Sequence, residues 1–133
     1  MNLKYVSRRR PPATNNMMGI GYVALNRAPR HTYRSVHHFP KNRFKMSTEY
    51  ECMGPPIIHS YRCGFHIFKT VVDARASAEL GVNVICKVVY RNIFNYGQVL
   101  LGGHINLKTG DMTNEYKAPV IVSRYRMIIE EVS

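Results

Sequence analysis

The sequence predicts an α+β fold: a β-rich single domain with one clear short helix at about residues 70–81. Two observations lead to this class. Alternating or β-branched segments recur from residue 20 to residue 132, whereas only one segment combines helical spacing with a cap. Hydrophobic residues make up 45% of the 133 residues, which suffices for one packed core. We therefore expect a domain over residues 20–133, preceded by a basic flexible arm over residues 1–19.

The first predicted strand spans residues 20–26, because Tyr22 and Ala24 alternate with Val23 and Leu25. The segment that follows, residues 27–45, is basic and is interrupted by two prolines, so it predicts a long loop. A short strand is expected near residues 43–50.

The clearest local pattern lies between residues 63 and 81. Residues 65–68 alternate faces and predict a strand with Phe65 on one face and His66 on the other. The Thr70 hydroxyl is placed to accept the amide of Asp73, which starts the helix. Gly81 is placed to end it in the left-handed conformation.

The second half of the chain predicts mostly strands. Residues 82–91 are strongly β-branched and predict a central strand. Residues 93–103 predict a further strand that ends at two glycines, and residues 104–116 predict a hairpin with its turn at 108–111. A long final strand is expected over residues 118–132.

Charge is the most informative bulk property. The net charge is +11, and residues 1–48 hold ten basic residues and no acidic one. The other 85 residues hold nine basic and eight acidic residues, a net of +1. This asymmetry predicts a polyanionic partner, although a role in solubility alone is the simpler alternative.

The predicted polyanion-binding residues are all the basic residues of this first segment: Lys4, Arg8, Arg9, Arg10, Arg27, Arg30, Arg34, Lys41, Arg43 and Lys45. Aromatic residues interleave with them, and we expect Tyr33, Phe39 and Phe44 to stack on bases if the partner is a nucleic acid.

The sequence gives little indication of metal binding or of nucleophilic catalysis. Cys52, His59, Cys63 and His66 are zinc-ligand types, but the close cysteine pair of a structural zinc site is missing, so we predict no metal site and no cofactor. The three cysteines predict free thiols, and no nucleophile or phosphate-loop motif is present. We expect His66 to be mostly buried and bonded to a backbone or hydroxyl group.

The pattern Cys63-x-Phe65-His66-x-Phe68-Lys69, followed by Asp73-Ala74, resembles a motif of small uncharacterised phage and prophage proteins. The first strand and the final strand are loosely similar to the same family. The resemblance implies a phage origin, with the host cytoplasm or the virion as location, more than it implies an activity.

A more distant similarity is to ADP-ribosyltransferases, and it implies a split-sheet fold. In that family His66 would take the place of a nicotinamide-stacking tyrosine, with Arg27 on the first strand and Glu115 as the late carboxylate. These three residues are the catalytic candidates if the protein is an enzyme, but we expect no catalysis.

The function that the sequence predicts is therefore a phage-encoded, non-enzymatic interaction protein. Its basic arm and loop would bind nucleic acid or an acidic protein surface of a host or virion assembly. The alternative is a virion or assembly component whose arm threads onto neighbouring subunits, so either way we expect part of a complex. No apolar run approaches the ~20 residues of a transmembrane segment.

Overall fold

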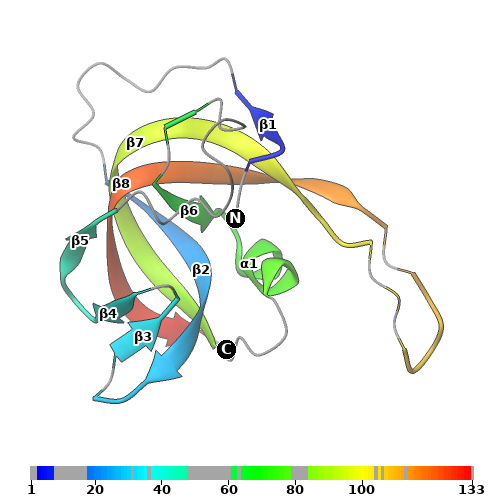
Figure 1. The fold of residues 1–133 in the computed structure, drawn as a ribbon, viewed down its shortest axis with the longest axis horizontal. Helices are drawn as coiled ribbons and strands as arrows, with labels where there is room; N and C mark the ends of the chain where they lie inside the picture. Colours follow the sequence, from blue (N-terminus) through cyan, green and yellow to red (C-terminus); the bar gives the residue numbers. More distant parts are fainter. Residues whose placement is uncertain are drawn as a thin grey trace.

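The computed structural model describes residues 3–7, 18–30, 32–35, 37–47, 61–62, 64–78, 84–103, 105, 107–112 and 114–132. They form one eight-stranded sheet and one short helix (Figure 1). The elements in chain order are β1 (Tyr5–Val6), β2 (Met18–Ala28), β3 (Thr32–Arg34), β4 (His38–Pro40), β5 (Phe44–Met46), β6 (Phe65–Phe68), α1 (Val71–Ser77), β7 (Val84–Leu101) and β8 (Tyr116–Val132). The predicted β-rich fold with one short helix is confirmed.

Four strands pair in a closed circuit. β7 and β8 pair antiparallel along almost their whole length and run side by side as two long curved ribbons (Figure 1). The other edge of β7 pairs with β2, and the other edge of β8 pairs with β6. The circuit closes where Tyr22 of β2 pairs with Phe68 of β6. Gly21 permits this crossing, because an added Cβ would overlap the Ile67 side chain and the Phe68 carbonyl oxygen.

Two hydrophobic clusters lie on opposite faces of this sheet. The first gathers Phe65 and Ile67 of β6 with residues of β2, β7 and β8, and it also contains Tyr33 and Phe39. The second gathers Phe68 of β6 and Ala74 of α1 with residues from both ends of β7 and from the start of β8: Ile85, Val99, Leu101, Ala118 and Val120. The predicted alternation of β6 is confirmed, because Phe65 and Phe68 lie in different clusters.

The helix begins as the sequence predicts. Thr70 is its N-cap, and the Thr70 Oγ1 accepts the Asp73 amide at 3.1 Å. Asp73 Oδ1 accepts the Tyr116 hydroxyl of β8 at 3.0 Å. The helix ends at Ser77, four residues before the predicted end, and Gly81 lies outside the described residues.

The loop predicted over residues 27–45 is wrong. β3 pairs with β2 and β4, so this segment holds two strands of three residues each. The short strand predicted near residues 43–50 is confirmed by β5, which pairs with β8. Pro40 is tolerated at the end of the edge strand β4, where no ladder donor is needed.

The two separate strands predicted over residues 82–91 and 93–103 are one strand in the structure, because β7 is continuous from Val84 to Leu101. Asn92 has φ 57° and the register shifts between Ile93 and Asn95, so the strand bends there instead of ending. The predicted glycine end is confirmed, since Gly102 and Gly103 have φ 85° and 74°.

Part of the predicted arm is paired with the sheet. Tyr5 and Val6 of β1 pair with Gln98 and Gly97 of β7. Residues 8–17, which include the three consecutive arginines, lie outside the described residues.

Candidate polyanion-binding surface

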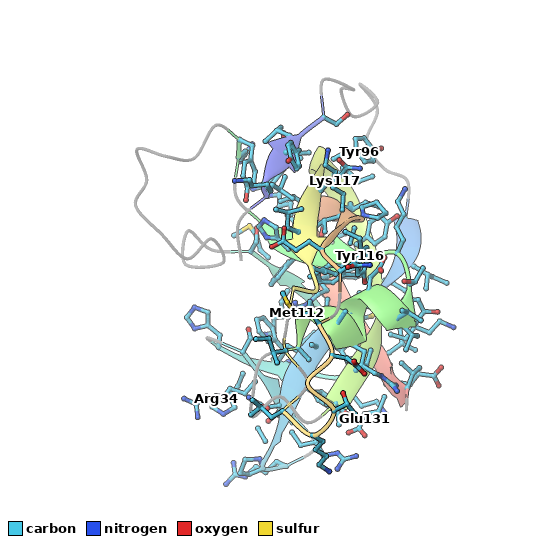
Figure 2. The ribbon with its side chains drawn as sticks, turned by 90° about the vertical axis from the view of Figure 1, so that its right-hand side faces the viewer. Arg34, Tyr96, Met112, Tyr116, Lys117 and Glu131 are labelled. Atoms are coloured by element: carbon cyan, nitrogen blue, oxygen red, sulfur yellow. The ribbon has the colours of Figure 1, made fainter. Side chains whose placement is uncertain are left out.

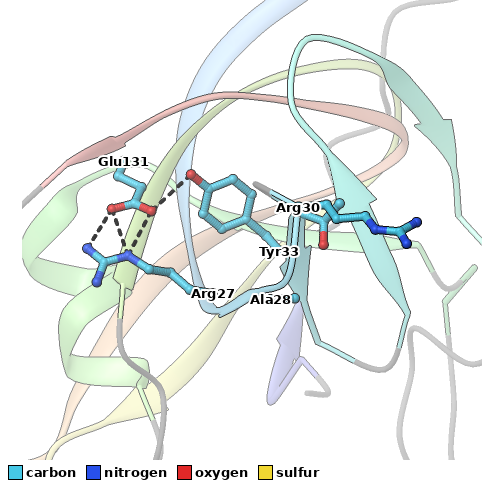
Figure 3. A pocket seen from close by; sticks show the side chains of 6 residues that line it. Arg27, Ala28, Arg30, Tyr33 and Glu131 are labelled. Atoms are coloured by element: carbon cyan, nitrogen blue, oxygen red, sulfur yellow. Dashed lines mark hydrogen bonds and ion pairs between the residues drawn. The ribbon is translucent and has the colours of Figure 1, made fainter.

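One pocket lies where the β2–β3 turn meets the end of β8 (Figure 3). It has a volume of about 260 Å³ and is lined by Arg27, Ala28, Arg30, Thr32, Tyr33 and Glu131. The β2–β3 hairpin builds it, because Arg27 pairs with Tyr33 and Ala28 pairs with Thr32 across the turn. The Thr32 hydroxyl donates to the Pro29 carbonyl at 2.8 Å and holds the turn closed.

Glu131 is the centre of the hydrogen bonds in this pocket. Arg27 Nη2 donates to Glu131 Oε2 at 2.8 Å, and Arg27 Nε donates to Oε1 at 3.0 Å. The Tyr33 hydroxyl donates to the same Oε1 at 3.0 Å (Figure 3). The Arg27 hydrogen bond holds the pKa of Glu131 below its usual value, because it stabilises the carboxylate. The positive charge of Arg27 is thereby balanced by the Glu131 carboxylate.

Tyr33 cannot act as a base in this pocket. Burial raises its pKa to about 12, and its hydrogen bond to Glu131 adds to the effect. It therefore stays a neutral donor at physiological pH. With Arg27 and Glu131 paired, the arrangement is a structural clamp between β2, β3 and β8.

Apart from Arg27, the described residues of the predicted polyanion-binding set make no ion pair with another described residue. Within the described part of the chain, the Arg27–Glu131 contact is the one ion pair, at 2.8 Å. The other described residues of the predicted polyanion-binding set are exposed, apart from Lys45, which is half-buried. The exposed residues are Lys4, Arg30, Arg34, Lys41 and Arg43. Arg8, Arg9 and Arg10 lie outside the described residues, so their part of the prediction has no structural account.

The structure places the three predicted stacking residues in different environments. Tyr33 and Phe39 are each 5% exposed and belong to the first core cluster, so they are removed as stacking candidates. Phe39 packs edge-on against Phe65 at 5.7 Å between ring centroids. Only Phe44 stays partly exposed.

Phe44 belongs to a surface that the sequence analysis did not predict. This surface lies on the same face of the sheet as α1, and α1 covers the opposite end of that face. Two cross-strand rows run over β5, β8, β7 and β2. One row is Met46, Tyr125, Arg91 and Met18, and the other is Phe44, Met127, Val89 and Ile20. We call these eight residues the aromatic–arginine face.

The centre of this face is a stacked guanidinium. The Arg91 Cζ lies 4.6 Å from the ring centroid of Phe44 and 4.6 Å from that of Tyr125. The Arg124 Cζ lies 5.5 Å from the Tyr125 centroid, and its Nη2 lies 3.6 Å from the Met46 sulfur. Period-two alternation in β7 and β8 is the sequence signal that could have placed Arg91 and Tyr125 on this face.

His66 is part of a hydrogen-bonded structure. Its Nε2 lies 2.8 Å from the Tyr61 hydroxyl, and its Nδ1 lies 3.0 Å from the Gly64 carbonyl oxygen. The predicted bonding to a hydroxyl and to the backbone is confirmed, but the predicted burial is only partial, because His66 is half-buried.

The three conditional catalytic residues do not share the pocket described above. The pocket that contains Arg27 is lined by neither His66 nor Glu115. Glu115 is exposed next to Tyr116, and Figure 2 places Tyr116 well away from Glu131. In the zinc set, Cys52, His59 and Cys63 lie outside the described residues. The described residues contain no group of three or more His, Cys, Asp or Glu side chains suited to a metal.

Comparison with protein-family models, with curated proteins and with solved structures gave no match to this chain. Among the described residues, no helix has the length and apolar character needed to cross a membrane.

Proposed function

We propose that this protein is a non-enzymatic interaction protein that binds a polyanion through the basic side chains of its first 48 residues. The observation that carries the proposal is the excess of exposed, unpaired charge. Arg30, Arg34 and Arg43 are exposed and make no ion pair with any described residue. An excess of positive charge on the surface attracts a polyanion, which releases its bound counterions when basic side chains contact it.

The distribution of charge supports a partner over a purely solubilising role. Nine of the nineteen basic residues share the rest of the chain with all eight acidic residues, whereas the first 48 residues have no acidic residue. A solubilising surface usually mixes the two signs. The predicted phage origin and the ADP-ribosyltransferase similarity support no activity here, since Arg27 is held by Glu131 and His66 does not line the pocket that contains Arg27.

The test is binding as a function of salt. A labelled oligonucleotide and heparin serve as probes, and their affinity for the full chain is measured by fluorescence anisotropy as salt rises. The test variant replaces Arg30, Arg34 and Arg43 with glutamine. The control variant replaces Lys69, Arg75 and Lys108, which are also exposed, and changes the net charge equally.

We expect the test variant to bind more weakly than the wild type. The slope of log affinity against log salt should become shallower by about 2, since each of the three lost contacts with a single-stranded probe removes ~0.7 from the slope. The control variant should keep most of the slope. Equal losses in both variants would show attraction by net charge without a defined site, and flat salt dependence of the wild type would refute the proposal.

A further inference from the structure

The aromatic–arginine face is an open part of the sheet. Met18, Ile20 and Met46 are 64%, 56% and 55% exposed, which is unusual for three apolar side chains on one face. The second core cluster and α1 occupy the other end of the same face, at Ile85 and Ala24. No described element covers the two rows of the aromatic–arginine face.

This face combines flat π surfaces with positive charge. Arg91 is held between two rings, and among the described residues its Nε has no hydrogen-bond partner. Neither row contains an acidic residue. β5 forms the edge of this part of the sheet, and the exposed Arg43 directly precedes it. The Arg124 side chain reaches this face, because it contacts the Tyr125 ring and the Met46 sulfur. A second copy of this chain would place guanidinium against guanidinium, so an anionic partner fits better.

We propose that the aromatic–arginine face binds single-stranded nucleic acid, with bases stacked on the Phe44 and Tyr125 rings that hold Arg91 and phosphates on Arg43 and Arg124. This inference rests on the proposed polyanion binding and names its substrate class. Unpaired bases stack on aromatic rings and on guanidinium planes, whereas a paired duplex hides its base faces. Each stacked base raises affinity by roughly five- to a hundredfold.

The first test uses the wild-type protein alone. A labelled thymidine oligonucleotide is compared with an abasic oligonucleotide of the same length, which has the same phosphates and no bases. We expect the abasic strand to bind at least tenfold more weakly at equal salt. Equal affinity for the two strands would overturn the stacking proposal while leaving polyanion binding intact.

The second test locates the site. Phe44→Leu and Tyr125→Leu remove a ring but no charge, and Tyr5→Leu is the matched control, because Tyr5 also stacks with a cation, at 4.2 Å from Lys117 Nζ. We expect the first two variants to lose fivefold or more in oligonucleotide affinity and to keep their heparin affinity, while an unchanged thermal melting transition reports that they are folded. Tyr5→Leu should change neither.

The outcomes separate the two proposals. If the wild type binds neither heparin nor the oligonucleotide, the proposed function fails and this inference fails with it. If heparin binds but ring removal leaves oligonucleotide affinity unchanged, or if both probes weaken together in Phe44→Leu and Tyr125→Leu, only the stacking site is refuted. Photocrosslinking of a bromouridine-substituted strand to the peptide that contains Tyr125 gives an independent positive result.

Discussion

The Tyr61 hydroxyl lies 2.8 Å from His66 Nε2 and also 2.8 Å from the Leu3 backbone nitrogen. The Leu3 amide must donate, so the hydroxyl accepts from it and donates its own proton to Nε2. The Gly64 carbonyl accepts only, which assigns the ring proton to Nδ1. A continuous chain of hydrogen bonds thus connects the N-terminal segment to β6.

We expect His66→Ala to lower the free energy of unfolding by about 1–2 kcal/mol, because it leaves the Tyr61 hydroxyl and the Gly64 carbonyl without their partner. Tyr61→Phe should act similarly and also release the Leu3 amide. Chemical denaturation measures both, with the exposed His38→Ala as control. A His66→Ala protein that keeps its stability but loses polyanion binding would instead make His66 a binding residue.

Gly97 allows the N-terminal strand to approach β7. A Cβ added there would overlap the Leu3 side chain and the Tyr5 carbonyl oxygen. We therefore expect Gly97→Val to displace β1 while β2 stays paired. Hydrogen exchange should become faster at the Lys4 and Ser7 amides, which donate to β7 at 2.9 and 2.8 Å.

Gln98→Ala is the control for this displacement, because it changes only a side chain and keeps the backbone pairing with Tyr5. Unchanged protection of Lys4 and Ser7 in Gly97→Val would contradict the close approach.

The Arg27–Glu131 pair predicts a dependence of stability on pH. The folded pKa of Glu131 is lowered, mainly by the Arg27 hydrogen bond, so its contribution is present above the unfolded pKa of about 4.3 and is lost as pH falls through the lower folded value. We expect wild type to be slightly more stable than Glu131→Gln at neutral pH, and the difference to vanish in acid.

Thermal melting across pH values measures this difference, with Glu115→Gln as the control for an exposed carboxylate. Added salt should also shrink it, since the pair is exposed. A stability difference between wild type and Glu131→Gln that grows as the pH falls would contradict this prediction.

Cys86 should be chemically inert in the folded protein. It is 0% exposed, and burial raises the pKa of its thiol to about 11, so little thiolate exists at neutral pH. We expect iodoacetamide to modify it only in denaturant, as read by mass spectrometry of its peptide. Rapid alkylation under native conditions would show that β7 opens easily.

The sequence predicted those parts of the fold that depend on neighbouring residues. The Thr70 cap and the alternation of Phe65 with His66 are local patterns, and both appear in the structure. The strands β3 and β4 were missed because each has three residues, too few to show a period, and because Pro29 and Pro40 favoured a loop. The short strand predicted near residues 43–50 is confirmed by β5.

The proposed binding surface was predictable only in its charge. Arg30, Arg34 and Arg43 are exposed, as a cluster of basic residues indicates. Arg91 and Tyr125 are 34 positions apart in the chain, and only the β7–β8 register brings them opposite each other. Aromatic residues in a basic segment also do not reveal which rings are buried, as Phe39 shows.

The closed circuit of strands has a consequence for how the chain is made. β8, at residues 116–132, supplies the partner edge for both β6 and β7, so the circuit cannot close until that segment has left the ribosome. Until then the nascent chain exposes the apolar faces of β2, β6 and β7. Because its pairings join segments distant in sequence, folding should be slow for a domain of this size and sensitive to chaperones that shield nascent strands.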